Sequence, residues 1–209
     1  MCKATHRRYF ETIYGFQDKG YIYSVLFYNI APILTKDKES VLLTFSKNSK
    51  RNLYSIWEKY RNDIEKQFDL DFFQLRKTDK TYNILFYNKE KLKKTLSKKR
   101  NRRFLERFGY NGLTDVKDYL RILSNRYERA CPHEIGIFLG YPLDDVVEFI
   151  DCPNKECLFT GYWKVYNNED VARQIFDHYD SIKEKTMNFI MDGHDWHMIY
   201  DYLDKKNIV

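Results

Sequence analysis

Apolar residues recur every three or four positions along several stretches of the chain, and this spacing predicts amphipathic helices. The clearest stretch starts at Asn48 or Ser49, either of which would cap a helix that extends to about Phe68. The apolar positions of this helix are Leu53, Ile56, Trp57, Tyr60, Ile64 and Phe68. Further helices are predicted over residues 21–30, 114–127, 135–139, 143–150, 169–191 and 195–203.

Shorter β-prone stretches predict strands. Residues 40–45 indicate a buried strand, and residues 70–76 and 82–87 flank the polar turn 77–81, a pattern that predicts an antiparallel hairpin. Residues 158–166 predict a fourth strand. Strands and helices do not alternate regularly along the chain. We therefore expect an α+β fold, in which a small, mostly antiparallel sheet of about four strands packs with several helices.

These elements suggest one domain with an appendage at each end. The predicted domain covers residues 21–185, and the chain is long enough to bury a sizeable core. Residues 1–20 lack a clean period and are expected to form an N-terminal extension, and residues 186–209 a C-terminal helical extension. No internal repeat, low-complexity segment or Pro/Ser-rich linker divides the sequence.

Composition excludes several classes of protein. Aromatic residues make up 17% of the chain, with only 8 Gly and 4 Pro, so intrinsic disorder is excluded for most of its length. No window approaches the roughly 18 apolar residues of a membrane helix, and no secretory signal is recognisable. The four cysteines, the first of them Cys2, are too sparse for a disulfide scaffold. We expect a cytoplasmic globular protein.

Two short motifs stand close together in the second half of the chain. They are Pro-His-Glu at 132–134 and Leu-Gly-Tyr-Pro at 139–142. With the segment 143–150 that follows them, and with Ala-Pro-Ile-Leu at 31–34, the sequence resembles the uncharacterised bacterial family called domain of unknown function 3793, over about residues 21–185. The resemblance implies a small cytosolic protein typical of anaerobic bacteria, and it implies no assigned catalytic activity.

The first candidate site lies at these motifs. His133 and Glu134 stand at a predicted helix start beside the turn that holds Tyr141. His133 would serve as acid or base, Glu134 as its partner, and Tyr141 would add a hydroxyl to the same pocket. The alternative is structural: Glu134 serves the helix N-terminus, His133 hydrogen-bonds to backbone, and Tyr141 packs. Our leading hypothesis is a small-ligand or catalytic site, and whether the protein is an enzyme stays open.

The predicted fourth strand adds ligand-binding candidates. Its alternation places Tyr162, Lys164 and Tyr166 on one face and Trp163 and Val165 on the other. One face could serve as a ligand platform, with Trp163 or Tyr162 contacting the ligand and Lys164 an anionic group. The alternative is a half-buried strand whose lysine stem covers its neighbours.

Cysteine and histidine residues leave a third hypothesis, a metal-handling protein. Three of the cysteines are Cys131, Cys152 and Cys157. With His133 they would make a Cys3His set only if the fold joined their loops, and their spacing lacks the paired knuckles of a structural zinc site. His194 and His197 would share a helix face, although histidines near a chain end are more often exposed bystanders. The sequence therefore assigns no metal ligand and no cofactor, and it carries no Walker loop, dinucleotide glycine fingerprint or serine elbow.

The positive charge of the chain is concentrated in one segment. The formal net charge is +6, yet residues 89–107 alone carry +8, and residues 144–209 carry −7. The cations singled out in this segment are Lys93, Lys94, Lys98, Lys99, Arg100, Arg102, Arg103 and Arg107. This patch would suit nucleic acid or an acidic protein partner, for example in an inhibitor of a nucleic-acid-guided system, with Tyr82, Phe86 and Tyr87 nearby as stacking surfaces. The alternative is a solvated face, because no established nucleic-acid motif is present.

Overall fold

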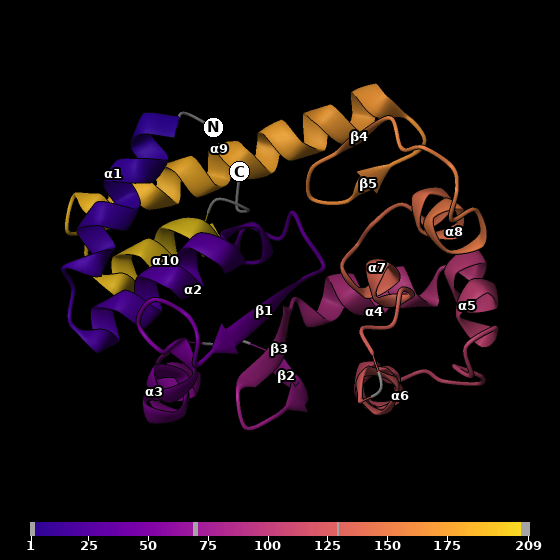
Figure 1. The fold of residues 1–209 in the computed structure, drawn as a ribbon, viewed down its shortest axis with the longest axis horizontal. Helices are drawn as coiled ribbons and strands as arrows, with labels where there is room; N and C mark the ends of the chain where they lie inside the picture. The colour runs from indigo at the N-terminus through magenta and orange to yellow at the C-terminus, as the bar shows by residue number, and fades with distance from the viewer. Residues whose placement is uncertain (1–2, 69–70, 129, 206–209) are drawn as a thin grey trace.

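The computed structural model describes residues 3–68, 71–128 and 130–205 (Figure 1). Its helices are α1 (Lys3–Tyr14), α2 (Asp18–Leu34), α3 (Leu53–Gln67), α4 (Lys89–Ser97), α5 (Lys99–Glu106), α6 (Val116–Tyr127), α7 (Ile135–Phe138), α8 (Leu143–Asp151), α9 (Glu169–Met191) and α10 (Trp196–Lys205). Its strands are β1 (Ser40–Ser46), β2 (Phe72–Lys77), β3 (Thr81–Tyr87), β4 (Phe159–Thr160) and β5 (Lys164–Val165). The α+β prediction is confirmed. Within the described residues, none of the helices combines the length and apolarity that a membrane crossing requires.

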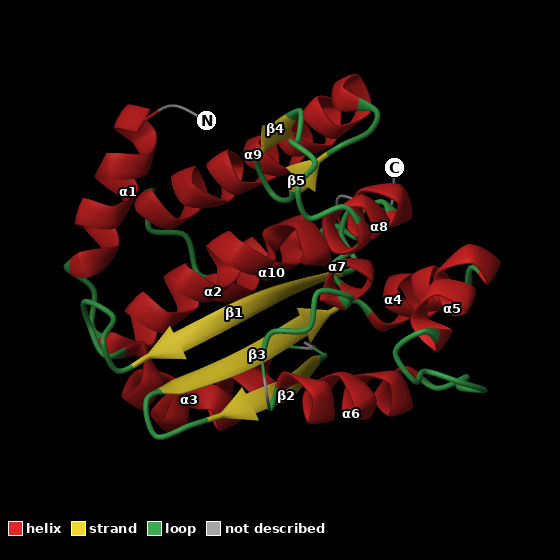
Figure 2. Ribbon diagram, turned by 45° about the vertical axis from the view of Figure 1, so that its right-hand side comes forward, coloured by secondary structure: helices red, strands yellow, loops and turns green. Residues whose placement is uncertain are grey.

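A three-stranded antiparallel sheet lies at the centre, in the order β1-β3-β2 (Figure 2). Successive side chains of its middle strand, β3, point to opposite faces of the sheet, and both faces are buried. Ile84 and Phe86 belong to one core, which also holds side chains of α1, α2, α3, α9 and α10. Leu85 and Tyr87 belong to a second core, which is shared with α4 to α8. Helices therefore cover both faces of the sheet.

The remaining two strands form a separate short hairpin, which packs on the N-terminal half of α9. Trp163 and Val165 contact Ala172 and Phe176 there and form a third apolar cluster. A Cβ on Gly161 would collide with the Phe176 ring, so the hairpin approaches α9 this closely only because this position is glycine. From the hairpin, α9 runs along one side of the molecule to α1 (Figure 1).

The single strand predicted over residues 158–166 is wrong. The chain reverses there, with the Gly161 amide bonded to the Trp163 carbonyl oxygen at 3.0 Å, and the two strands pair antiparallel. Tyr162 lies in the turn and does not share a strand face with Lys164. The one local signal for this reversal is Gly161, because glycine inside a β-prone stretch often marks a turn or a bulge.

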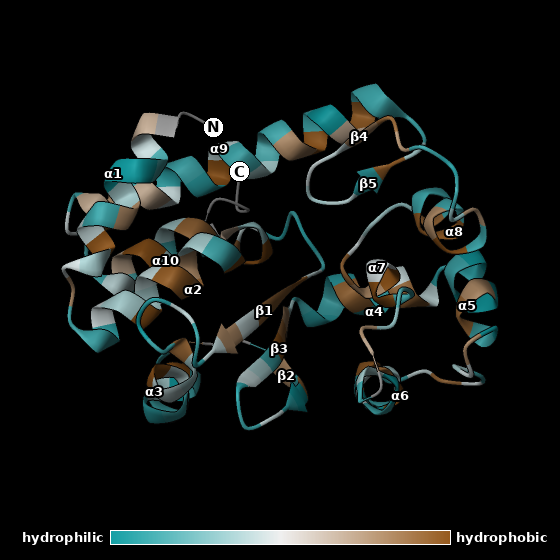
Figure 3. Cartoon of the chain, viewed as in Figure 1, coloured by the Kyte–Doolittle hydropathy of each residue, from teal (hydrophilic) through white to brown (hydrophobic). Residues whose placement is uncertain are grey.

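Other boundaries also differ from the predictions. The helix expected to start at Asn48 or Ser49 is capped by Asn52, whose side chain accepts from the Ser55 amide. The basic stretch forms two helices, α4 and α5, because the backbone at Lys98 leaves the helical region between them. The second of these helices, α5, is mostly hydrophilic (Figure 3). The predicted start of β2 at residue 70 lies outside the described residues.

The two segments expected to be extensions pack against the first core. In α1, Tyr9 and Ile13 are fully buried, and in α10 so are Ile199 and Leu203. Residues 1–20 do contain a helix, although their sequence shows no clean period. The division at residues 21 and 185 stays a prediction.

Candidate functional site

The turn after α7 is held by the segment that leads into β1. Lys38 Nζ donates to the Leu139 carbonyl oxygen at 2.8 Å, and Ser40 Oγ donates to the Phe138 carbonyl oxygen at 2.7 Å. Between them the Glu39 carboxylate lies against Gly140, where a Cβ would collide with it. Gly140 also has φ +77°, in the region that favours glycine. Residues 38–40 thereby fix the backbone of the Leu-Gly-Tyr-Pro motif.

Asp145 on α8 anchors the β4–β5 hairpin. Its Oδ2 accepts from Trp163 Nε1 at 2.7 Å, and its Oδ1 accepts from the amides of Tyr166 and Asn167 at 3.0 and 2.9 Å. The side-chain amide of Asn167 adds a fourth bond at 3.2 Å. Asp145 is only 2% exposed, and these four donors account for both of its oxygens. The carboxylate therefore has a structural role in joining α8 to the hairpin.

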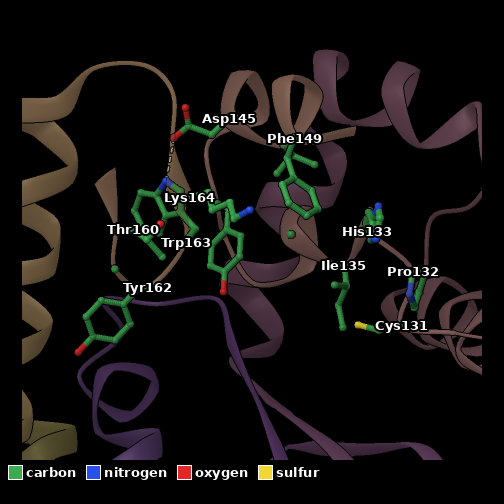
Figure 4. Close-up of a pocket in the computed structure, with 14 residues that line it drawn as sticks. Cys131, Pro132, His133, Ile135, Asp145, Phe149, Thr160, Tyr162, Trp163 and Lys164 are labelled. Atoms are coloured by element: carbon green, nitrogen blue, oxygen red, sulfur yellow. Dashed lines mark hydrogen bonds between the residues drawn. The ribbon is translucent and has the colours of Figure 1, made fainter. Parts of the chain in front are cut away.

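A cavity of about 410 Å³ opens between α7, α8 and this hairpin (Figure 4). We call it the α7–α8 pocket. Its lining residues come from two neighbouring stretches of the sequence: Cys131, Pro132, His133, Ile135, Gly136, Tyr141, Asp145, Val146 and Phe149, and then Thr160, Gly161, Tyr162, Trp163 and Lys164. The volume falls within the usual range for small-molecule sites, and most of the wall is apolar or aromatic.

Phe149 stands at the rim between two polar side chains. The His133 ring meets the Phe149 ring edge-on, with centroids 5.0 Å apart, and Lys164 Nζ lies 5.4 Å from the same centroid. Figure 4 shows the Lys164 side chain directed toward the side of the pocket on which Phe149 and His133 lie. His133 and Lys164 are both exposed, and no described side chain forms an ion pair with either.

The inner wall is formed by two neighbouring aromatic rings, tilted by 30° to each other. Tyr141 lies 5.2 Å from Trp163, centroid to centroid, and Lys38 Nζ lies 5.1 Å from the Tyr141 centroid. Burial raises the pKa of Tyr141 to about 12, so its hydroxyl stays protonated at neutral pH. Tyr162 lines the opposite end and donates to Asp180 Oδ1 at 2.8 Å, and burial together with this bond raises its pKa well above the ordinary value.

A second cavity of about 490 Å³ adjoins the pocket and shares His133, Phe149 and Lys164 with it. We call it the outer cavity. Its other lining residues are Pro153, Lys155, Glu156, Cys157 and Tyr166. The three shared side chains therefore form the boundary between an inner apolar space and an outer space of mixed, more polar lining.

Glu134 is not among the residues that line either cavity. Its side chain is 1% exposed and lies on the other side of α7, where Tyr110 Oη donates to it at 3.3 Å and Arg126 forms an ion pair with it. Nor does its side chain cap the helix. The structure thus separates two residues that are neighbours in sequence: His133 faces the pocket and Glu134 faces the second core.

The cysteines and terminal histidines do not gather. Among the described residues, no group of three or more His, Cys, Asp or Glu side chains is placed to hold a metal ion. Cys131 lines the α7–α8 pocket and Cys157 the outer cavity, while Cys152 is exposed at the end of α8. The rings of His194 and His197 contact Phe189 and Phe68, respectively. Cys2 lies outside the described residues.

The eight candidate cations of the basic segment are all exposed on α4 and α5 or just after them. Two of them are tied to α8: Arg100 bonds Asp144 at 2.6 Å, and Arg107 holds both oxygens of Asp151 at 2.6 and 2.9 Å. We call the other six the basic face: Lys93, Lys94, Lys98, Lys99, Arg102 and Arg103. The idea that the hairpin aromatics flank it as stacking surfaces is wrong, because Tyr82, Phe86 and Tyr87 are all buried in the cores on either side of the sheet.

Sequence reasoning missed three residues that shape the pocket. Lys38 lies about a hundred positions from the turn it supports, and no local pattern singles it out. Asp145 and Phe149 belong to a helix that was predicted without a role. Their spacing of four places them on one face of α8, which is the only local signal that they could act together.

Comparison with known proteins places the chain in a family. A family model described as "Protein of unknown function (DUF3793)" matches residues 26–200, most of the chain. No curated protein and no solved structure matches it. The matched range includes α7, α8, the hairpin and all of α9, and thus every residue of the α7–α8 pocket. The family resemblance is therefore confirmed, and the chain is a member of the DUF3793 family of proteins of unknown function.

Proposed function

We propose that this protein binds a small organic ligand in the α7–α8 pocket. The observation that carries this proposal is the pocket itself, in which the two family signatures and the hairpin meet around aromatic walls and two exposed polar groups. Apolar cavities of a few hundred Å³ with a small number of convergent polar groups are the usual form of small-molecule sites.

Binding is better supported than catalysis. A general acid or base needs a partner that orients it, within hydrogen-bond reach. Glu134, the expected partner of His133, bonds to Arg126 and Tyr110, and none of the described side chains bonds to the His133 ring. A catalytic role for His133 and Tyr141 remains the alternative, and turnover of a bound ligand would reveal it.

The test uses the indole N–H signals of the protein in a ¹H–¹⁵N correlation spectrum. The sequence holds only three tryptophans, and Trp163 alone lines the pocket. We titrate with two neutral aromatic probes, indole and 2-naphthalenemethanol. The proposal predicts a saturable shift of the Trp163 signal, with those of Trp57 and Trp196 unchanged. Shifts of all three signals alike, or no saturable shift at millimolar probe, would overturn it.

A matched pair of variants localises the binding. Phe149 and Tyr202 are both 36% exposed, on α8 and α10 respectively, and only Phe149 lines the pocket. Phe149→Ala should weaken binding of the neutral probes by about two- to tenfold, the effect of losing one aromatic contact. Tyr202→Ala should leave the affinity unchanged. Equal effects of the two substitutions would place the probe elsewhere.

As a second candidate function, we propose that the basic face binds the phosphate backbone of a nucleic acid. Lys93 and Arg102, from successive helices, both line a small cavity of about 220 Å³ beside the start of α6, a space suited to a phosphate group. Affinity for single- and double-stranded oligonucleotides, measured by fluorescence anisotropy, should fall with salt, with a log–log slope of about 0.9 per phosphate neutralised on a duplex. Replacing Lys93 and Arg102 by Ala should reduce that slope. Absent binding at low salt, or equal competition by polyglutamate, would overturn the proposal, and the second result would favour an acidic protein partner.

A further inference from the structure

The α7–α8 pocket and the outer cavity meet at one boundary. His133, Phe149 and Lys164 line both spaces, whereas the rings of Tyr141 and Trp163 line only the inner one. A ligand that fills the inner space can therefore reach the outer cavity past these three side chains. The buried part of such a ligand would contact the aromatic wall, and its exposed part would contact the polar side chains of the boundary.

The inner space favours a flat, apolar group. Tyr141 and Trp163 lie with their ring centroids 5.2 Å apart, at an angle of 30°, and Val146 and Ile135 close the wall around them. Asp145 is the only Asp or Glu residue that lines it, and four hydrogen bonds already engage its two oxygens. Aromatic side chains arranged in this way recognise a planar ring by offset or edge contacts.

The boundary is electropositive because the acidic residues of α8 are already engaged. Asp144 pairs with Arg100, Asp151 with Arg107, and Glu148 with Lys155 at 2.9 Å. Lys164 has no such partner in the described chain. Its ammonium therefore lacks a carboxylate at the point where the two spaces join.

One carboxylate near the boundary, that of Glu156, carries the opposite charge. Glu156 is exposed and lines the outer cavity, but it does not line the inner pocket. An anionic group placed far out in the outer cavity would meet it, whereas one placed at the shared boundary meets Lys164 and the His133 ring first. The favourable position for negative charge is thus the boundary itself.

We infer that the ligand of the α7–α8 pocket is a planar ring that carries an anionic group, with the ring against Tyr141 and Trp163 and the anionic group between His133 and Lys164. This inference rests on the proposed small-ligand function. A carboxylate and a phosphate share the required charge. Lys164 supplies the charge, and His133 supplies a ring nitrogen that can donate a hydrogen bond.

The test compares four naphthalene probes that differ only in the substituent at position 2. They are the neutral methanol, the carboxylate, the phosphate and the methylammonium, titrated against the Trp163 indole signal. The two anions should bind about five- to tenfold more tightly than the neutral probe, and the cation most weakly. The stronger of the two anions shows which of the two groups the boundary prefers.

Two variants locate the charge preference. Lys164→Met should remove most of the advantage of the anions while leaving the neutral probe within about twofold, and Lys164→Gln repeats the test with a polar side chain. Lys185→Met, an exposed lysine of α9 outside both cavities, is the control and should change nothing. Equal binding of all four probes, or an anion preference that survives both Lys164 substitutions, would overturn the inference and leave the pocket as a neutral binding site. If none of the probes shifts the Trp163 signal, the proposed function itself fails.

Discussion

Lys38 gives the sharpest test of how the pocket is held in place. Its side chain is 4% exposed, and its ammonium lies between the Tyr141 and Tyr179 rings, 5.1 and 5.2 Å from their centroids. Burial, together with the nearby charges of Lys183 and Lys91 and against that of Glu39, lowers the pKa of Lys38 to about 8. A buried ammonium of this kind should make the stability of the fold depend on pH.

The direction of this pH dependence follows from the number of protons that the folded and unfolded chains bind. The unfolded chain keeps the Lys38 proton up to the ordinary pKa of 10.5, whereas the folded chain begins to lose it near pH 8. Between these values the unfolded state binds more protons, so the free energy of unfolding rises with pH. At about 1.4 kcal/mol per pKa unit the whole effect is about 3 kcal/mol, and most of it falls between pH 7 and pH 10.

Lys38→Met removes the charge and keeps the length of the side chain. At pH 7 the variant escapes the cost of the buried charge but leaves the Leu139 carbonyl without its donor, a loss of about 1–3 kcal/mol, so the two effects nearly cancel. As pH rises from 7 to 10, wild type should gain about 2–3 kcal/mol relative to the variant. The difference between the two proteins is informative because the ionisation of tyrosines as pH approaches 10 affects the stability of both.

Urea unfolding at pH 7, 8, 9 and 10 measures this difference. Lys94→Met, an exposed position on α4, controls for the general loss of one positive charge. A stability difference between wild type and Lys38→Met that stays constant within about 0.5 kcal/mol over this range would refute the reasoning. It would mean that the ammonium reaches solvent or finds a carboxylate, and that the turn is held some other way.

Three further substitutions test the framework around the pocket. Gly140→Ala should lower the free energy of unfolding by more than about 2 kcal/mol in a denaturant titration, because the positive φ and the Glu39 carboxylate both oppose a Cβ. Gly112 also has a positive φ but no atoms near the place of a Cβ, so the control Gly112→Ala should cost only about 1 kcal/mol. Asp145→Ala leaves the Trp163 indole and two backbone amides without an acceptor. It should therefore lower the free energy of unfolding by about 3 kcal/mol or more and broaden the Trp163 indole signal. An unchanged spectrum would contradict the anchoring role of Asp145. Glu134→Ala should cost about 2–4 kcal/mol by leaving Arg126 and Tyr110 unpaired, yet change probe affinity less than twofold; a loss of binding without loss of stability would restore Glu134 to the site.

Local periodicity predicted most of the helices because the buried positions of a helix recur every three or four residues within the same segment. The predicted range 169–191 coincides with α9, and 40–45 falls within β1. Prediction failed where the deciding contact is distant. The hairpin at 158–166 depends on a reversal at Gly161 that α9 stabilises through Phe176, and nothing within the segment itself reports that contact.

The candidate site likewise depends in part on local pattern and in part on distant contacts. That His133, Tyr141 and Lys164 line one pocket depends on the docking of the hairpin to α8 through Asp145, which is a long-range event. Which of two adjacent residues, His133 or Glu134, faces the pocket depends on the direction in which α7 starts. The sequence marks the pair as polar residues at a helix start, and only the packed structure decides between them.

The family signatures therefore combine two kinds of residue. Gly140 is required by the backbone of the turn and by the close approach of Glu39, and Glu134 joins α7 to α6 through Arg126. His133 and Tyr141, in contrast, present side chains to the pocket. A shared motif of this composition indicates a common shape of the site more directly than a common reaction, because most of its positions determine where the chain turns. Members of the family that keep the turn but differ at His133 or at the residue equivalent to Lys164 would then keep the cavity and change what it accepts.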